Sequence, residues 1–149
     1  PNGGVEEVVH GTTVAANAVL QRLGAETALV TTRHFRDVLE LRRLRIPHMY
    51  DLFWRKPPPL VERRLRFEVA ERMAADGTVV RPLDEEAVRA VAARLRDLGI
   101  DSVAVCFLHS YLHPEHERRA GAILAEELPE ATISLSSEIL REQRNGGRR

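Results

Sequence analysis

The sequence has little cysteine and no excess of either charge. Cys106 is the only cysteine among 149 residues, which excludes an intrachain disulfide and fits a reducing compartment. Lysine plus arginine and aspartate plus glutamate each number 22, so the balance does not indicate a nucleic-acid or anionic-membrane partner. No apolar run approaches the roughly 18 to 20 residues that span a bilayer. We therefore expect a cytoplasmic protein that binds neither nucleic acid nor membrane.

The residues that are present have the composition of one globular domain. Apolar residues make up 44% and charged residues 30% of the chain. Its length allows a hydrophobic core that needs no stabilising disulfide or metal ion. Residues 1–4 lack both an initiator Met and the charged-then-apolar pattern of a signal peptide. We predict a domain over residues 1–144 and a polar tail over residues 145–149.

Strand and helix patterns alternate near the N-terminus. Residues 5–9 predict a short strand, and one apolar face over residues 14–23 predicts a helix. Residues 28–30 form a second apolar strand pattern, which ends at Thr31 and Thr32 before another helix pattern. This order of strand, turn, helix and strand is typical of a parallel sheet.

The middle of the chain departs from this alternation. Residues 47–59 carry three aromatic side chains ahead of three consecutive prolines, which exclude a helix interior. Apolar and charged residues then alternate over residues 64–69, and Asp76-Gly77 gives a turn signal. We interpret residues 64–81 as an antiparallel β-hairpin inserted into the sheet domain.

The last third returns to alternating helices and strands. Asp84 suits an N-cap, and the apolar helical stripe that follows it ends at Gly99. Residues 103–108 form a continuous apolar strand, as in a sheet that is covered on both faces. Pro114 suits the first turn of a further helix, and residues 133–135 suggest one more strand. The predicted fold is an α/β domain, with a parallel or mixed sheet flanked by helices on both faces and an inserted β-hairpin.

The strongest local feature is the turn His10-Gly11-Thr12-Thr13 between the first strand and its helix. Backbone N–H groups at a helix start and two threonine hydroxyls suit a phosphate or carboxylate, and Gly11 lets a ligand approach the backbone. The alternative is a threonine N-cap after a glycine turn. Asn17 lies about one helical turn further on, where it either reaches the same ligand or faces water.

Two later turns follow strands at the equivalent place. They supply Phe35, Arg36, Asp37, His109 and Ser110. Because ligands in open α/β sheets bind beyond the carboxyl ends of the strands, these turns are expected to line one crevice. The alternative for Arg36 and Asp37 is an exposed pair of little energetic value.

Histidine and cysteine give weaker signals. His113 and His116 stand three residues apart at a helix start, whereas two metal ligands on one helix face usually stand four apart, so we assign no metal site. His116 alternatively lies on the buried face of that helix. Cys106 lies inside an apolar strand, where a buried thiol would be inert.

Taken together, these segments resemble the N-terminal domain of the hydantoinase A and 5-oxoprolinase family. The similarity includes the His10-Gly11-Thr12-Thr13 turn and keeps the family's order and spacing from about residue 5 to residue 144. The matching stretches are residues 10–15, 17–20, 28–32, 35–40, 50–54, 56–61, 82–85, 104–111, 114–117 and 136–138.

The resemblance implies a fold similar to the actin-like, ribonuclease-H-like ATPases. It also implies an ATP-dependent hydrolase of cyclic amides such as hydantoin, N-methylhydantoin or 5-oxoproline, while related carboxylases act on ketones. ATP and Mg²⁺ would be the cofactors of the full-length enzyme. The partners would be the remainder of a hydantoinase A-like subunit and a hydantoinase B-like subunit. The turn residues named above are expected to bind and position nucleotide or substrate, and no nucleophile or general base is assigned.

The sequence also departs from the family pattern. The family opens with an Asp-x-Gly-Gly-Thr-x-Thr-Asp phosphate loop, which Gly3-Gly4 does not reproduce, and His34 stands where glycine is usual. The agreement stops after Arg144. We therefore expect a domain truncated at both ends, which forms one wall of the crevice, is inactive alone and binds ATP with Mg²⁺ only weakly. The alternative is a non-catalytic interaction or dimerisation domain that makes contact through residues 50–54.

Overall fold

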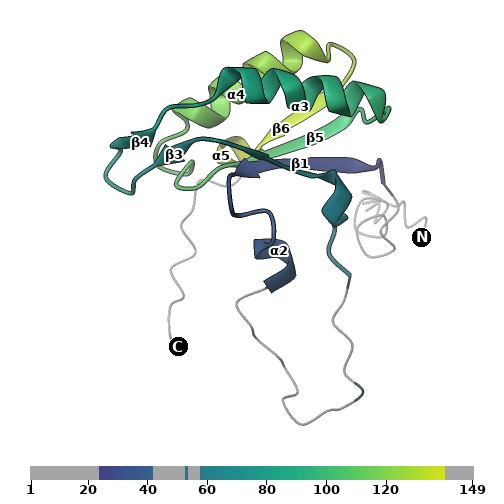
Figure 1. Cartoon of the computed structure of the whole chain (residues 1–149), viewed down its shortest axis with the longest axis horizontal. Helices are drawn as coiled ribbons and strands as arrows, with labels where there is room; N and C mark the ends of the chain where they lie inside the picture. Colours follow the sequence, from purple (N-terminus) through teal and green to yellow (C-terminus); the bar gives the residue numbers. More distant parts are fainter. Residues whose placement is uncertain (1–23, 42–52, 54–57, 140–149) are drawn as a thin grey trace, which may run out of the picture.

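The central feature of the computed structural model, which describes residues 24–41, 53 and 58–139, is a sheet of four parallel strands (Figure 1). The strand order is β2-β1-β5-β6. The strands are β1, Thr27–Thr32; β2, Arg66–Val69; β5, Ser102–Cys106; and β6, Thr132–Leu135. The predicted α/β class is thereby confirmed. The predicted strand at residues 5–9, the helix at 14–23 and the domain boundary at 144 lie outside the described residues.

Two helices form the crossovers between parallel strands. α3, Glu85–Asp97, leads into β5, and α4, Glu115–Glu127, leads into β6. Asp84 caps α3 as predicted, because its carboxylate accepts the Ala87 N–H at 3.0 Å. Both helices lie on the same side of the sheet (Figure 1). The short helices are α2, Val38–Leu41; the 3₁₀ turn η2, Arg63–Leu65; and α5, Ser136–Ile139.

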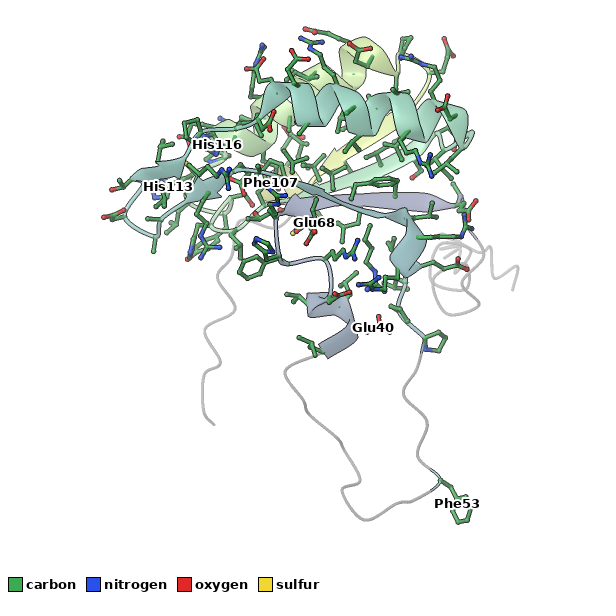
Figure 2. The ribbon with its side chains drawn as sticks, in the orientation of Figure 1. Glu40, Phe53, Glu68, Phe107, His113 and His116 are labelled. Atoms are coloured by element: carbon green, nitrogen blue, oxygen red, sulfur yellow. The ribbon has the colours of Figure 1, made fainter. Side chains whose placement is uncertain are left out.

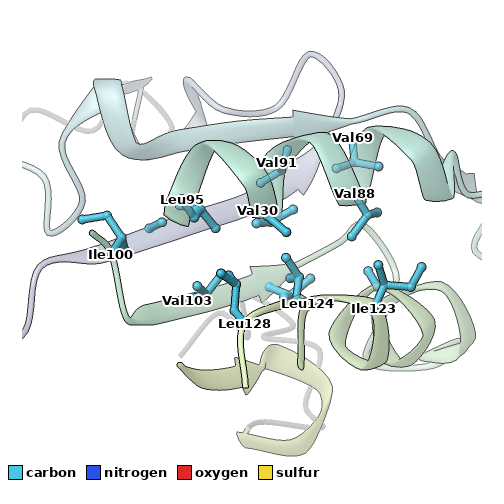
Figure 3. Packing of buried hydrophobic residues seen from close by; sticks show 14 of the residues in the cluster. Val30, Val69, Val88, Val91, Leu95, Ile100, Val103, Ile123, Leu124 and Leu128 are labelled. Carbon is cyan, nitrogen blue, oxygen red and sulfur yellow. The ribbon is translucent and has the colours of Figure 1, made fainter. Parts of the chain in front are cut away.

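The hydrophobic core lies between these two helices and one face of the sheet (Figure 3). Side chains alternate between the faces of a strand, so every second residue of β1 and β5 enters the core. The buried strand residues include Ala28, Val30, Val103 and Val105, and the helices contribute Val88, Val91, Ala92, Leu95, Ala120, Ile123 and Leu124. None of the described helices has the length and apolar character needed to cross a membrane.

The opposite face of the sheet is less completely covered than the sequence predicts. Leu29 and Ala104 are half-buried there, and Cys106 is exposed. The prediction of a buried Cys106 is wrong, because Cys106 alternates with Val105 and Phe107, which face the core. An apolar run does not by itself reveal which face of the strand is covered.

The predicted hairpin over residues 64–81 is wrong in its first half. β2 pairs in parallel with β1 and belongs to the main sheet, whereas the antiparallel pair consists of β3, Arg72–Met73, and β4, Val79–Arg81. Alternation of apolar and charged residues predicts a strand but does not identify its partner. Gly77, with a φ of 88°, forms the hairpin turn, and a Cβ atom there would lie 2.7 Å from the His113 ring. The hairpin tip therefore packs against the loop between β5 and α4.

Replacement of Asp84 by alanine should lower the free energy of unfolding by about 0.5–2 kcal/mol, because the Ala87 N–H loses its acceptor. Urea unfolding followed by circular dichroism measures the change. Asp97→Ala is the matched control. Asp97 is an exposed carboxylate at the C-terminal end of α3, where the helix dipole does not stabilise an anion. Equal losses of stability in the two variants would contradict the capping role.

Candidate functional site

The four parallel strands end at one edge of the sheet, and polar groups gather beyond that edge. The Leu108 N–H donates to Thr32 Oγ1 at 3.1 Å, which joins the residues that follow β5 directly to the end of β1. The Arg33 N–H donates to Val69 O at 2.9 Å and joins the ends of β1 and β2 in the same way. Open α/β sheets bind their ligands at this carboxyl edge.

Glu117, in the first turn of α4, is fully buried and connects the ends of β5 and β6. Its Oε1 accepts the Ser136 hydroxyl at 2.6 Å and the Phe107 N–H at 3.3 Å. Its Oε2 accepts the Ser137 N–H at 2.8 Å. Ser136 Oγ lies 3.1 Å from Ser110 Oγ, so the same network reaches the loop after β5. A buried carboxylate is costly unless it is hydrogen-bonded, so these donors are necessary for its burial.

Glu71, which follows β2, is a second buried carboxylate at this edge. The Thr32 hydroxyl donates a short hydrogen bond to Glu71 Oε1. His116 Nδ1 lies 2.9 Å from Glu71 Oε2, and the His116 side chain is only 14% exposed. In Figure 2, His116 and His113 lie toward the end of the molecule that carries the β3–β4 hairpin. Glu71 therefore links the strand ends to α4.

A pocket of about 460 Å³ opens beside Glu71 at the end of β1. It is lined by Thr32, Arg33, His34, Phe35, Glu71, Arg72, Val80 and Arg81, and we call it the arginine pocket. The Arg72 guanidinium lies over the Phe35 ring, with its central carbon 5.1 Å from the ring centroid. In the described part of the chain, the side chains of Arg33, Arg72 and Arg81 form no hydrogen bond or ion pair. The pocket is therefore cationic and free to contact an anion.

A second pocket of about 310 Å³ lies at the opposite, amino edge of β5 and β6. It is lined by Arg96, Gly99, Ile100, Asp101, Glu127, Leu128, Pro129, Glu130 and Ala131. Arg96 is already engaged by Glu127 at 3.4 Å, and the amino edge is not where open α/β sheets bind ligands. We therefore place the candidate site at the carboxyl edge.

The structure separates the site residues predicted after β1. Phe35 lines the arginine pocket. Asp37 instead pairs with Arg63, at 2.9 and 3.2 Å, and this hydrogen bond lowers the pKa of the Asp37 carboxyl. The Arg36 carbonyl accepts from Arg66 Nη1 at 3.3 Å. Asp37 thus has an exposed pairing partner, which is Arg63 rather than Arg36, and its role in binding a ligand stays a prediction.

The other predicted site residues are distributed as follows. Ser110 is buried in the Glu117 network, while the neighbouring His109 is half-buried and has a positive φ of 62°. His10, Gly11, Thr12, Thr13 and Asn17 lie outside the described residues, so their role as a binding turn stays a prediction.

Sequence reasoning missed Glu71, Glu117, Arg72 and Arg81. Glu71 continues the apolar alternation of residues 65, 67 and 69, and Glu117 lies three and seven residues before two buried positions of α4, Ala120 and Leu124. Acidic residues in apolar positions signal buried carboxylates. The arginines gave no comparable signal, because the β3–β4 hairpin brings them to the end of β1 from a distant part of the sequence.

The described residues include no group of three or more His, Cys, Asp or Glu side chains arranged to hold a metal ion. Both oxygens of Glu71 and of Glu117 already accept or share hydrogen bonds within the protein. His116, one of the histidines considered from the sequence, is the partner of Glu71. Glu71 and Glu117 are thus engaged within the protein, while the arginine pocket suits an anionic group.

A family model described as the hydantoinase/oxoprolinase N-terminal region matches residues 1–128. Among curated relatives, the acetophenone carboxylase gamma subunit of Aromatoleum aromaticum is 37% identical over 144 residues, which cover 91% of this chain and 20% of the relative. The 5-oxoprolinase 1 of Arabidopsis thaliana is 34% identical over 158 residues, which cover 93% of this chain and 12% of the relative.

The fold is also found in a solved relative. The crystal structure of the ATP-dependent caprolactamase from Pseudomonas jessenii matches with a TM-score of 0.82 and 34% identity, covering 90% of this chain and 20% of that one. The chain thus spans a fifth or less of the length of these relatives.

Glu117→Gln should lower the free energy of unfolding by roughly 1.5–3 kcal/mol. The glutamine amide nitrogen is a donor, so it would replace an acceptor oxygen opposite the N–H and O–H donors that now bind the carboxylate. Urea unfolding tests this. Glu126→Gln, at an exposed position of the same helix, is the matched control and should change little. Equal stability of the Glu117 variant and the wild type would show that the network does not hold the edge together.

Cys106 should react slowly with a thiol reagent at neutral pH although the residue is exposed. Although the residue is exposed at the surface, the protein around its thiol partly desolvates the sulfur, and this desolvation raises the pKa of the thiol. A hydrogen bond with Ser136 lowers the pKa and the Glu117 charge raises it, both to a smaller extent. A raised pKa means less thiolate at pH 7, so the labelling rate should rise at higher pH than for glutathione. The rate is measured over a pH series on the folded chain. A midpoint at or below that of glutathione would contradict the expectation.

Proposed function

Because the chain belongs to the family of hydantoinase/oxoprolinase N-terminal regions, we propose that it is part of an ATP-dependent hydrolase subunit that acts on cyclic amides of the hydantoin or 5-oxoproline type. A relative whose structure is an ATP-dependent caprolactamase supports the ATP dependence and the cyclic amide substrate. A 5-oxoprolinase relative supports the same class of substrate. In this proposal the chain contributes one wall of the crevice and is inactive without the rest of the enzyme.

The observation that supports this role is the convergence of the ends of β1, β2 and β5 on one polar edge. Glu71 and Glu117 take their donors from that edge itself, so they hold the loops in place rather than act on a substrate. The arginine pocket offers, beside them, cationic groups that pair with no described carboxylate. The edge is therefore suited to binding and positioning, and no described residue is assigned as nucleophile or general base.

Phosphate transfer from ATP to the amide oxygen would supply the activation that an unreactive amide carbonyl needs. The residues of this chain would bind and orient the anionic groups, with His10, Gly11, Thr12, Thr13 and Asn17 as the proposed second contact. Mg²⁺ and the remaining phosphate contacts would come from elsewhere in the subunit. A hydantoinase B-like subunit is the proposed partner.

A second candidate is a non-catalytic interaction domain, which one observation favours. The described elements cover the sheet face that carries Leu29, Ala104 and Cys106 only partly, whereas parallel sheets are usually covered on both faces. Such a face suits a contact with another polypeptide. The two candidates differ in whether ATP turnover depends on a cyclic amide.

The test uses the complete polypeptide that contains this chain, together with any subunit that purifies with it. ADP release should depend on a cyclic amide, and the ring-opened amino acid should form in step with ADP. Thr12→Ala should lower this activity by about tenfold or more. The variant loses the proposed hydrogen bond from the Thr12 hydroxyl to an anionic group, and such a bond contributes about 1.5–3 kcal/mol. Thr132→Ala, at an exposed position where β6 begins, is the matched control and should not lower it.

Two results would contradict the proposal. ADP release that responds to a ketone and bicarbonate, but not to any cyclic amide, would assign the carboxylase chemistry that the acetophenone carboxylase relative suggests. A complete polypeptide that binds its partner without any ATP turnover would favour the interaction domain instead.

A further inference from the structure

We propose that the arginine pocket at the end of β1 is a binding site for a phosphate group. Only the source of that phosphate rests on the proposed function. Phosphate binding itself can be measured on the chain alone. Its lining shares no residue with the predicted His10–Thr13 turn. Phe35 in the lining was predicted from the sequence as a site residue, whereas Arg72 and Arg81 were not.

The pairing of arginines across the structure supports the proposal. Most described arginines outside the pocket pair with a carboxylate; these are Arg63, Arg64, Arg66, Arg89, Arg96 and Arg119. Arg33, Arg72 and Arg81 have no such partner in the described part of the chain, yet they line one pocket. Glu71, the acidic residue of the lining, is occupied by Thr32 and His116. The pocket therefore keeps a net positive charge even when Glu71 is ionised.

Hydrogen bonds from three consecutive backbone N–H groups hold the turn that carries Arg33. Glu68 Oε1 accepts the His34 N–H at 2.7 Å and the Arg36 N–H at 3.4 Å, and the Phe35 N–H donates to Thr32 O at 3.1 Å. Glu68 lies in β2, an outer strand of the sheet, where it is in register with Thr31 of β1. A fixed turn lowers the entropy that is lost when a ligand is bound.

The side chains suit phosphate better than a carboxylate. A guanidinium presents a planar fork of donors that binds phosphate oxygens in pairs, and a phosphate has enough oxygens to engage several arginines at once. A single carboxylate would satisfy one arginine and leave the others unpaired. Stacking on Phe35 restricts the Arg72 guanidinium without using its donors, so Arg72 remains available to the ligand.

The test is titration of the 149-residue chain with inorganic phosphate at constant ionic strength, followed by calorimetry or by amide chemical shifts. We expect saturable binding that is weakened about tenfold or more by Arg81→Gln and by Arg33→Gln, both at exposed positions. Arg94→Gln and Arg118→Gln are matched controls, because these arginines are also exposed and have no side-chain partner among the described residues, but lie outside the pocket. Both controls should bind phosphate as the wild type does. Circular dichroism verifies that each variant folds.

Further titrations identify the source of the phosphate. ADP that competes with phosphate and loses affinity in Arg81→Gln would assign the pocket to the nucleotide, while phosphate binding that ADP does not displace would assign it to free phosphate. Acetate that binds as tightly as phosphate, equal losses in the pocket and control variants, or binding that does not saturate would each overturn the proposal. None of these results affects the assay for cyclic amide hydrolysis, so the two proposals fail separately.

Discussion

The carboxylate of Glu117 lies in the protein interior, where an anion is stable only if hydrogen-bond donors surround it. The N–H groups of Phe107 and Ser137 and the hydroxyl of Ser136 meet this requirement, and they belong to the segments that follow β5 and β6. Glu71 imposes the same requirement where β1 and β2 end, through Thr32 and His116. The need to satisfy two buried carboxylates therefore sets the positions of the loops at the carboxyl edge.

This constraint leaves the neighbouring arginines available for other contacts. Because Glu71 and Glu117 are satisfied from within the protein, they do not compete for the arginines that line the neighbouring pocket. Glu68 similarly takes the backbone N–H groups of the turn after β1. The acidic groups near the edge thus maintain its shape, while three guanidinium groups remain without a partner in the described part of the chain.

The elements that the sequence predicted well are those with local causes. The N-cap at Asp84, the positive φ of 68° at Gly99 and the core-facing stripe of α3 follow from residues within a few positions of one another. What the sequence did not reveal depends on partners that are distant along the chain. β2 pairs with β1 across more than thirty residues, so its assignment to a hairpin was wrong. For the same reason, the meeting of Arg33 with Arg72 and Arg81 could not be predicted from the sequence.

His34 illustrates how the site and the fold constrain each other. The family usually has glycine at this position, and the backbone of His34 has a φ of 74°, a conformation that is easy for glycine and strained for most other residues. The hydrogen bond from the His34 N–H to Glu68 helps to offset that strain. Like-charged arginines in one pocket also repel one another, and pairing each with a carboxylate would remove that cost. The electrostatic imbalance favours an anionic ligand, because a bound phosphate would neutralise the charge of arginines that no described carboxylate pairs with.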